Sequence, residues 1–233
     1  MKNILIIGAS HGLGDAFSIG LPDIKDTVWL VSRSEPASLN RTDKVTRQWI
    51  KTDLSNNKVH EVISENIGNI PLDLLIYNAG IWEQDTLEKE SAEQLQEIIA
   101  VNLTSAITTV HALLPNLKVA KNAKVILIGS TSGLENEGGT AVAYTASKFG
   151  IRGLAQSLRA YLRQDGITVT CINPGSMATD LSLDDGVEAA IKKHAGKRIP
   201  VQDIVSIVKM ITTLSYVSCV KEINVPAIAD TDV

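Results

Sequence analysis

A tyrosine and a lysine stand four residues apart in the second half of the chain, at Tyr144 and Lys148. Apolar residues recur at spacings of three and four over 144–164, which predicts a helix that carries both side chains on one face. A phenol with a pKa of about 10 is a poor base at neutral pH, but a nearby ammonium favours the phenolate. The pair is therefore a candidate centre for moving a proton to or from a bound molecule.

A glycine-rich turn follows the predicted strand Asn3–Ile7 near the start of the chain. Glycines let the backbone approach a pyrophosphate there, and the N-terminus of the next helix offers free N–H groups and a favourable dipole. Taken alone, such a turn is also compatible with a purely structural strand-to-helix connection. As a dinucleotide site it would use Gly8, Ser10, His11, Gly12, Leu13 and Gly14.

Further motifs follow the glycine turn along the chain. They are Tyr77-Asn78-Ala79-Gly80, Asn102, Ser130, Tyr144-Thr145-Ala146-Ser147-Lys148 and Asn173-Pro174-Gly175. Their order, and the spacing of three residues and then one between the glycines of the turn, resemble the short-chain dehydrogenase/reductase family. The resemblance covers about residues 3–180 and implies an enzyme that transfers hydride between nicotinamide and a carbonyl or alcohol.

This resemblance implies a set of four catalytic residues. Tyr144 would donate a proton to the carbonyl oxygen, Ser130 would hydrogen-bond the same oxygen, and Lys148 would hold the nicotinamide ribose. Asn102 would hold a water that connects Lys148 to solvent. Ser132 lies two residues beyond Ser130, so the sequence leaves open which serine binds the carbonyl, although the predicted strand end favours Ser130.

The residues at the end of the second predicted strand bear on the choice of cofactor. An NAD site needs a carboxylate there for the ribose 2′-hydroxyl, whereas an NADP site needs a cation. Ser32 occupies this place and Arg33 follows, so we predict NADP(H), with His11 assisting. Glu35 keeps NAD(H) open as the alternative.

The family resemblance assigns the rest of the cofactor site to turns that follow strands, where open α/β sheets bind ligands. Asp53 would hydrogen-bond the adenine amino group, and Thr179 would hold the nicotinamide carboxamide. The residues implied at these turns are Asp53, Leu54, Asn78, Ala79, Gly80, Pro174, Gly175 and Thr179, and Tyr144 and Lys148 would also contact the cofactor.

Short apolar runs alternate with longer amphipathic stretches, which predicts an α/β fold with a doubly wound, seven-stranded parallel sheet, a Rossmann fold. Helices are clearest at 91–114, 144–164 and 201–214. Residues 33–44 contain Pro36 and little periodicity, so we predict a loop there. The strands are predicted at 3–7, 27–32, 45–51, 72–78, 124–129, 168–173 and 222–225.

Composition limits the remaining possibilities. The 233 residues suit a single domain, 1–233, and a net charge of −4 without a basic run argues against nucleic acid as a partner. Cys171 and Cys219 lack metal-ligand spacing, so we predict no disulfide and no metal. Because no apolar run suits a membrane span or signal peptide, we expect a cytoplasmic protein. The resemblance implies a homodimer, through 91–114 and 144–164, or a homotetramer.

The segment 177–200 lies where the family keeps a mobile lid over its substrate. Basic residues in it raise the hypothesis of an acidic substrate, but acidic neighbours cancel much of that charge, which favours an ordinary solvated helix face. The basic residues are Lys192, Lys193, His194, Lys197 and Arg198, and the acidic ones are Asp180, Asp184, Asp185 and Glu188.

Two other functions compete with a small-molecule oxidoreductase. An NADP(H)-binding redox sensor or scaffold would need the glycine turn, but not Ser130, Tyr144 and Lys148 together. A nucleotide-sugar epimerase or dehydratase shares a tyrosine–lysine pair, but it needs a larger C-terminal lobe than the residues after Thr179 provide. The combined motifs therefore favour NADP(H)-dependent reduction or oxidation of a carbonyl or alcohol.

Overall fold

The computed structural model describes residues 1–134 and 140–229, and a parallel sheet runs through the middle of this part of the chain. Its order is β3-β2-β1-β4-β5-β6-β7, and all neighbouring strands are parallel. The doubly wound fold predicted from sequence is thereby confirmed. The strands are β1 Asn3–Ile7, β2 Thr27–Ser32, β3 Thr46–Lys51, β4 Leu74–Tyr77, β5 Lys124–Ile128, β6 Thr168–Pro174 and β7 Glu222–Val225.

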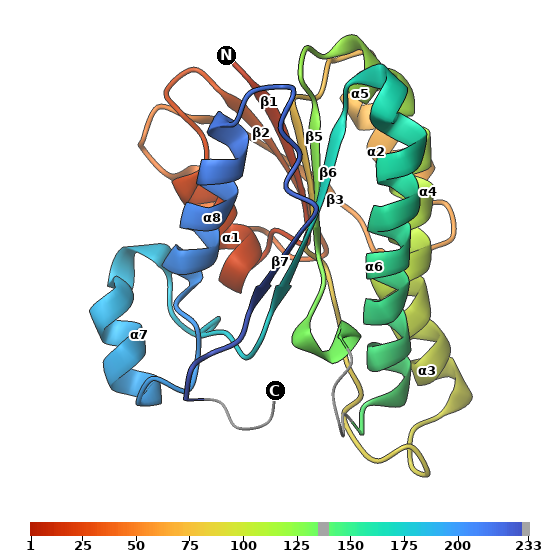
Figure 1. Ribbon diagram of the computed structural model, residues 1–233, viewed down its shortest axis with the longest axis vertical. Helices are drawn as coiled ribbons and strands as arrows, with labels where there is room; N and C mark the ends of the chain where they lie inside the picture. Colours follow the sequence, from red (N-terminus) through yellow and green to blue (C-terminus); the bar gives the residue numbers. More distant parts are fainter. Residues whose placement is uncertain (135–139, 230–233) are drawn as a thin grey trace.

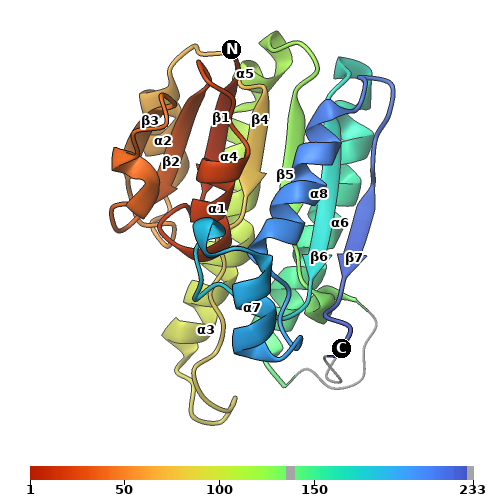
Figure 2. The same ribbon diagram turned by 90° about the vertical axis from the view of Figure 1, so that its left-hand side faces the viewer.

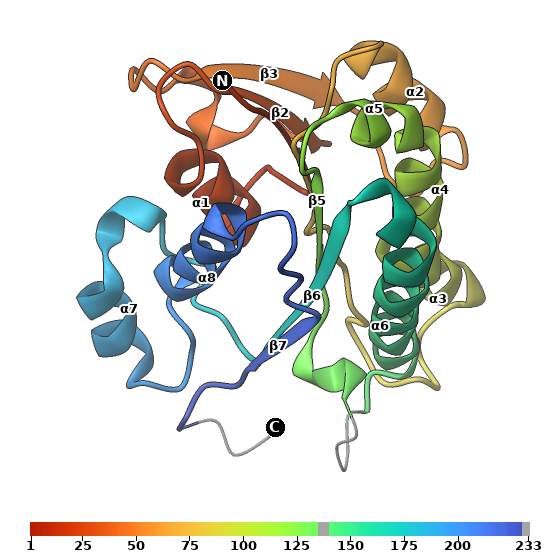
Figure 3. The same ribbon diagram turned by 45° about the horizontal axis from the view of Figure 1, so that its top comes forward.

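Helices cover both faces of the sheet, which stands between them in Figures 1 and 3. The face with the N-terminal helix carries α1 Gly12–Gly20, α7 Val187–His194 and α8 Val201–Thr213. The opposite face carries α2 Val59–Ile67, α3 Ala92–Ile99, α4 Ser105–Ala112, α5 Leu114–Val119 and α6 Val142–Leu162. Each face has its own cluster of buried aliphatic side chains, so the sheet forms the wall between two cores.

Burial along the strands follows their place in the sheet. All residues of β4, β5 and β6 are buried, as expected for inner strands covered on both faces. The edge strands β3 and β7 alternate instead between exposed residues and residues that are partly buried or, at Ile50, buried. The predicted boundaries of β1, β2 and β7 agree with the structure, and the other strands differ only by one or two residues at an end.

The predicted continuous helix over 91–114 is wrong in one respect. Ser91 caps α3 through a capping box with Gln94, but the helix then opens into a π-helical turn at Ala100–Thr104 before α4 begins. A π-turn inserts an extra residue into a helical turn and changes the direction of the side chains around it. Asn102 lies inside this turn.

The order of the strands places a crevice beside β1. The chain proceeds from β1 outward to β2 and β3 and then returns to form β4 on the other side of β1 (Figure 2). The loop predicted at 33–44 is confirmed, with one short 3₁₀ turn at Ala37–Asn40. Among the described residues, no helix is both long enough and apolar enough to cross a membrane.

Candidate active site

A cavity of about 330 Å³ lies at the carboxyl ends of the central strands. Ligands bind at this place in open α/β sheets. Of the residues assigned from sequence, those that line it are Gly8, Ser10, His11, Gly12, Leu13, Arg33, Asp53, Leu54, Asn78, Ala79, Gly80, Ser130, Tyr144, Lys148, Pro174, Gly175 and Thr179. Gly14 and Asn102 are the assigned residues that stand behind this lining.

The glycine turn brings the start of α1 against the sheet. A Cβ at Gly14 would lie 1.9 Å from the Gly8 carbonyl oxygen, so any side chain there would push the helix off the turn. Gly12 has a φ of +58°, and a Cβ on it would lie 2.9 Å from the Thr179 Cβ. The turn therefore needs glycine for close packing at one position and for its backbone conformation at the other.

Lys148 is buried beneath the cavity floor. Its residue is 4% exposed, and its Nζ donates a hydrogen bond to the Ile128 carbonyl oxygen at 3.0 Å. The same Nζ lies 5.4 Å from the centre of the Tyr144 ring, so the two side chains face one another as their spacing predicts. Burial lowers the pKa of Lys148 to about 8.

The phenol of Tyr144 responds mainly to burial. Burial raises the pKa of Tyr144, a hydrogen bond with the Ser130 side chain lowers it, and the charge of Glu83 raises it. From its spacing, Lys148 was expected to favour the phenolate, but the surroundings that this chain provides favour the neutral phenol. The positive charge of an oxidised nicotinamide bound nearby would lower the pKa of this phenol.

The structure distinguishes the two candidate serines. Ser130 lines the cavity beside the Tyr144 phenol, whose pKa it lowers, while its Oγ accepts a hydrogen bond from the Ser132 amide at 3.1 Å. Ser132 is outside the cavity lining. Ser130 is therefore the serine placed beside the phenol.

Asn102 is fixed by the π-turn behind the cavity. Its Oδ1 accepts from the Ile81 amide at 2.8 Å, and its Nδ2 donates to the Ile81 carbonyl at 2.8 Å and to the Ser147 Oγ at 3.0 Å. A Cβ at Gly80 would lie 3.4 Å from the Lys148 Nζ and 3.8 Å from the Asn102 Oδ1. Gly80 thus separates the two polar groups without a side chain that would fill the space between them.

At the opposite end of the cavity, Arg33 faces Asp53. Their closest charged atoms are 3.8 Å apart, and the side chains are 66% and 47% exposed, so the pair is loose and Arg33 can reach another anion. Glu35, which kept NAD(H) open, is outside the lining and accepts a hydrogen bond from Asn40 at 3.2 Å. The Ser32 hydroxyl donates to the Ser34 carbonyl at 2.7 Å.

The segment 177–200 is tied together by Asp180, the neighbour of Thr179. Its carboxylate lies 2.8 Å from the Lys193 Nζ, 2.9 Å from the His194 Nε2 and 3.9 Å from an Arg198 nitrogen. The hydrogen bond from Lys193 is the largest of the effects that lower the pKa of Asp180 to about 2. These contacts join the end of α7 to the residue that follows the cavity wall.

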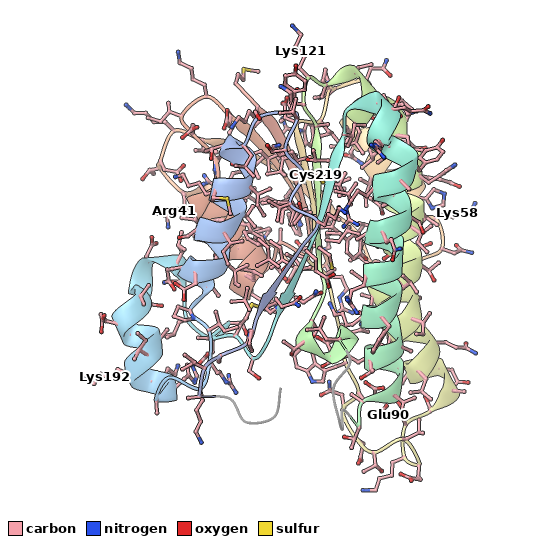
Figure 4. All side chains as sticks on the ribbon, viewed as in Figure 1. Arg41, Lys58, Glu90, Lys121, Lys192 and Cys219 are labelled. Atoms are coloured by element: carbon pink, nitrogen blue, oxygen red, sulfur yellow. The ribbon has the colours of Figure 1, made fainter. Side chains whose placement is uncertain are left out.

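A second ion pair anchors the same segment further along. Arg41 and Asp184 are 2.6 Å apart, which connects the loop after β2 to residues 183–185. Figure 4 labels Arg41 and Lys192 on the side of the molecule that carries α7 and α8. Several of the charged side chains in segment 177–200 therefore pair with other residues of the protein.

Comparison with known proteins agrees with this geometry. The family model for short chain dehydrogenases matches residues 2–187. A 3-dehydrosphinganine reductase of Arabidopsis thaliana is 32% identical over 200 residues, which cover 83% of this chain and 59% of that protein. The 3-oxoacyl-(acyl-carrier-protein) reductase of Escherichia coli is 29% identical over 222 residues, covering 91% and 90%. The chain belongs to the short-chain dehydrogenase/reductase family.

A solved structure supports the family assignment at the level of the fold. A short chain dehydrogenase family protein from Francisella tularensis superposes with a TM-score of 0.79 at 25% identity, and 96% of each chain is covered. As a short-chain dehydrogenase/reductase, the protein is an NAD(P)H-dependent oxidoreductase of carbonyl and alcohol groups. Its substrate is accordingly a small molecule.

The residues present suit a dinucleotide. The free N–H groups at the start of α1 lie at the glycine turn, and a side chain at Gly12 would fill the space between this turn and Thr179. The cavity also has a lining that the sequence argument missed, which includes Ile81, Trp82, Glu97, Val101 and Met177. Trp82 lies two residues after Gly80, so its place in the lining could have been predicted from sequence. Glu97 and Val101 come from α3 and the π-turn, and no motif marked them.

Proposed function

We propose that this short-chain dehydrogenase/reductase reduces a carbonyl compound with NADPH, using Tyr144, Ser130, Lys148 and Asn102. One observation carries the proposal: the Tyr144 phenol, its Ser130 partner and the buried Lys148 converge on the cavity that the glycine turn also lines. Two relatives are named as reductases, which supports the direction of the reaction.

The chain's own groups handle the proton and the carbonyl oxygen. The bound nicotinamide supplies the hydride. The Tyr144 hydroxyl donates its proton to the carbonyl oxygen, and Ser130, which lines the cavity beside that phenol, stabilises the charge that develops on the same oxygen. Burial favours the neutral phenol, which is the form that this step consumes.

Lys148 and Asn102 restore the proton in the proposed scheme. A lysine with a pKa of about 8 can exchange protons close to neutral pH, and we also assign Lys148 the contact with the nicotinamide ribose. Asn102 is held rigidly by Ile81 and Ser147, with its Oδ1 facing the Lys148 Nζ across Gly80. We assign it the positioning of a water on the path from Lys148 to solvent.

The preference for NADP(H) over NAD(H) is part of the proposal. Arg33 lines the cavity, is only loosely paired, and is free to bind a 2′-phosphate through a charge-assisted bond. Position 32 carries a serine where an NAD site would present a carboxylate, and Glu35 is outside the cavity lining. His11 lines the same cavity and is the second group for the phosphate.

The remaining assignments extend the same scheme. Residues 177–200 would close over the substrate as a lid within a single domain, because Met177 and Thr179 line the cavity and Asp180 ties them to α7. Exposed apolar residues on α4 and α6 support self-association. The cytoplasmic location remains a prediction.

The direct assay of this function follows NADPH absorbance with a panel of ketones, aldehydes and 3-oxo thioesters. We expect saturable consumption of NADPH with at least one of these classes of carbonyl compound, and slower consumption of NADH with the same compound. If the folded protein binds NADPH tightly but leaves all carbonyl classes unreduced, the catalytic proposal fails and the binding protein considered above takes its place.

A further inference from the structure

The loop between β4 and α3 carries a carboxylate to the start of α6. Glu83 accepts hydrogen bonds at Oε1 from the Ala143 amide at 2.6 Å and from the Tyr144 amide at 3.2 Å. Ala141, which precedes the helix, makes no side-chain cap bond of its own. Glu83 therefore supplies the missing cap from 60 residues away in the sequence.

This cap acts on the residue that the chemistry uses. The first N–H groups of a helix have no partner within the helix, and a capping oxygen stabilises the first turn. Tyr144 is the third residue of α6, so the Glu83 bonds hold the backbone from which the phenol projects into the cavity. Loss of this contact would loosen the position of the hydroxyl.

Glu83 also brings a negative charge that its surroundings only partly neutralise. Its second oxygen, Oε2, is buried and has no hydrogen-bond partner among the described residues. Charges act more strongly on their neighbours where water is excluded. A carboxylate in this position opposes the formation of a second negative charge on the neighbouring phenol.

The groups around the phenol come from three parts of the chain. Ser130 lies beside it in the turn after β5, Lys148 faces it from α6, and Glu83, in the loop after β4, binds the backbone amide of the same residue. Burial and Glu83 both raise the pKa of Tyr144, and the Ser130 bond lowers it. The other charged or titratable side chains that line the cavity are His11, Arg33, Asp53 and Glu97.

We propose that Glu83 is a positioning residue for Tyr144, which fixes the first turn of α6 and keeps the phenol protonated for carbonyl reduction. The proposal rests on the proposed function, in which Tyr144 is the proton donor. Its consequence is directional: Glu83 preserves the acid needed for reduction up to a higher pH, and it disfavours the phenolate needed for alcohol oxidation.

The variant Glu83→Gln removes the charge but keeps the cap, because the glutamine side-chain oxygen can still accept hydrogen bonds from the Ala143 and Tyr144 amides. Tyrosinate absorbance after rapid pH jumps, with Tyr144→Phe used to assign the signal, reports the titration of this one phenol. We expect it to move to lower pH in Glu83→Gln, because the negative charge of Glu83 raises the pKa of Tyr144. The high-pH decline of carbonyl reduction should move in the same direction.

Glu90→Gln is the matched control. Glu90 belongs to the same loop and accepts from the Gln84 and Asp85 amides at 2.6 and 2.8 Å, and Figure 4 labels it near the end of the molecule where α3 lies. Its replacement should leave the Tyr144 titration unchanged.

Two results would overturn the role of Glu83. One is an unshifted Tyr144 titration in folded Glu83→Gln, or an equal shift in Glu90→Gln. The other is failure of both Glu83→Gln and Glu83→Ala to fold cooperatively, which would make Glu83 a folding cap only. A shifted titration in a protein whose Tyr144→Phe variant retains turnover would instead support Glu83's effect on the phenol and reject Tyr144 as the catalytic acid.

Discussion

Lys148 shows at the residue scale how a functional group can oppose folding. Its ammonium is removed from water and donates to one carbonyl oxygen, that of Ile128, so the charged form is only partly compensated. Burial accordingly lowers the pKa of Lys148 from 10.5 to about 8. The proposed roles of Lys148 in binding the cofactor and relaying protons would account for keeping such a group in the core.

Replacing Lys148 by methionine should therefore separate stability from function. The unfolded chain binds the lysine proton below pH 10.5 and the folded chain only below about pH 8, so burial costs about 3 kcal/mol at neutral pH. We expect Lys148→Met to be more stable than the parent below pH 8, with the difference vanishing towards pH 10.5. NADPH affinity and turnover should fall together.

Urea unfolding over this pH range and NADPH titration check both parts of this prediction. A variant less stable than the parent at pH 7 would contradict the burial cost. Unchanged NADPH affinity would contradict the assigned ribose contact.

Arg33 is the residue to which we assign the proposed preference for NADP(H). Removing a charge-assisted pair costs about 1 to 3 kcal/mol, so Arg33→Ala should weaken NADPH binding by roughly 5- to 150-fold and leave NADH almost unchanged. Glu35→Gln, nearby but outside the cavity lining, is the control and should alter neither constant much. Equal losses for the two cofactors, or tighter binding of NADH by the parent, would reject the preference for NADP(H).

At the scale of elements, the strands were the most predictable part of the chain. The inner strands are short, continuous aliphatic runs, which only a sheet covered on both faces can bury, and turn residues mark their ends. The π-turn at Ala100–Thr104 had no such signal, because the helical spacing of apolar residues continues through it. The turn is instead accompanied by hydrogen bonds from Asn102 to Ile81 and Ser147, which are distant in the sequence. The cap from Glu83 was equally invisible, since it joins residues 60 positions apart.

The candidate site could likewise be predicted where it depends on local sequence, but not where it depends on contacts between distant residues. Most of the motif residues could be placed from sequence because they stand at strand ends or near helix starts, and nearly all of them line one cavity, whereas Asn102 lies in the π-turn behind it. The choice between Ser130 and Ser132 required the actual course of the turn. Lys193 and His194 on α7 pair with Asp180 because the chain brings the end of this helix back to that residue. No local sequence pattern predicts this approach.

The segment 177–200 permits a test with two adjacent lysines. Lys193→Gln removes the contact with Asp180, whereas Lys192→Gln removes the same charge from the neighbouring position. If attachment to Asp180 shapes the lid, Lys193→Gln alone should speed amide exchange in α7 and raise the KM for carbonyl substrates several-fold. Equal KM increases for both variants, limited to acidic substrates and suppressed by salt, would favour the acidic-substrate hypothesis instead.

At the scale of the whole molecule, both helical layers expose some large apolar side chains, and those on α4 and α6 bear on self-association. On the side of α4 and α6, large apolar side chains are exposed, with Ile107 at 45%, Phe149 at 43% and Tyr161 at 57%. Gly153 lies one helical turn after Phe149, and a Cβ there would meet nothing within 4 Å. A small residue beside exposed apolar ones suits the close approach of a second helix pair.

Phe149→Glu should accordingly weaken self-association. A charge introduced into an apolar interface must be desolvated without a partner, so the dimer expected through α4 and α6 should dissociate at micromolar concentration. Met210→Glu is the control, because Met210 is 45% exposed on α8, on the opposite face of the sheet. Light scattering after size exclusion measures both, and an unchanged mass for Phe149→Glu would place the interface elsewhere.

The central claim is that Tyr144 gives the proton in an oxidoreductase rather than packing in a cofactor-binding scaffold. Tyr144→Phe removes only the hydroxyl. The packing of the ring, the hydrogen bond from the backbone amide of residue 144 to Glu83, and the cofactor cavity should therefore persist. General acid catalysis contributes about 10² to 10⁴ in rate, so turnover of a carbonyl that the parent reduces should fall at least 100-fold. The NADPH dissociation constant, measured on the same sample, should stay within a few-fold of the parent. A Tyr144→Phe protein with the parent's turnover would contradict the account and leave only the binding of the nucleotide.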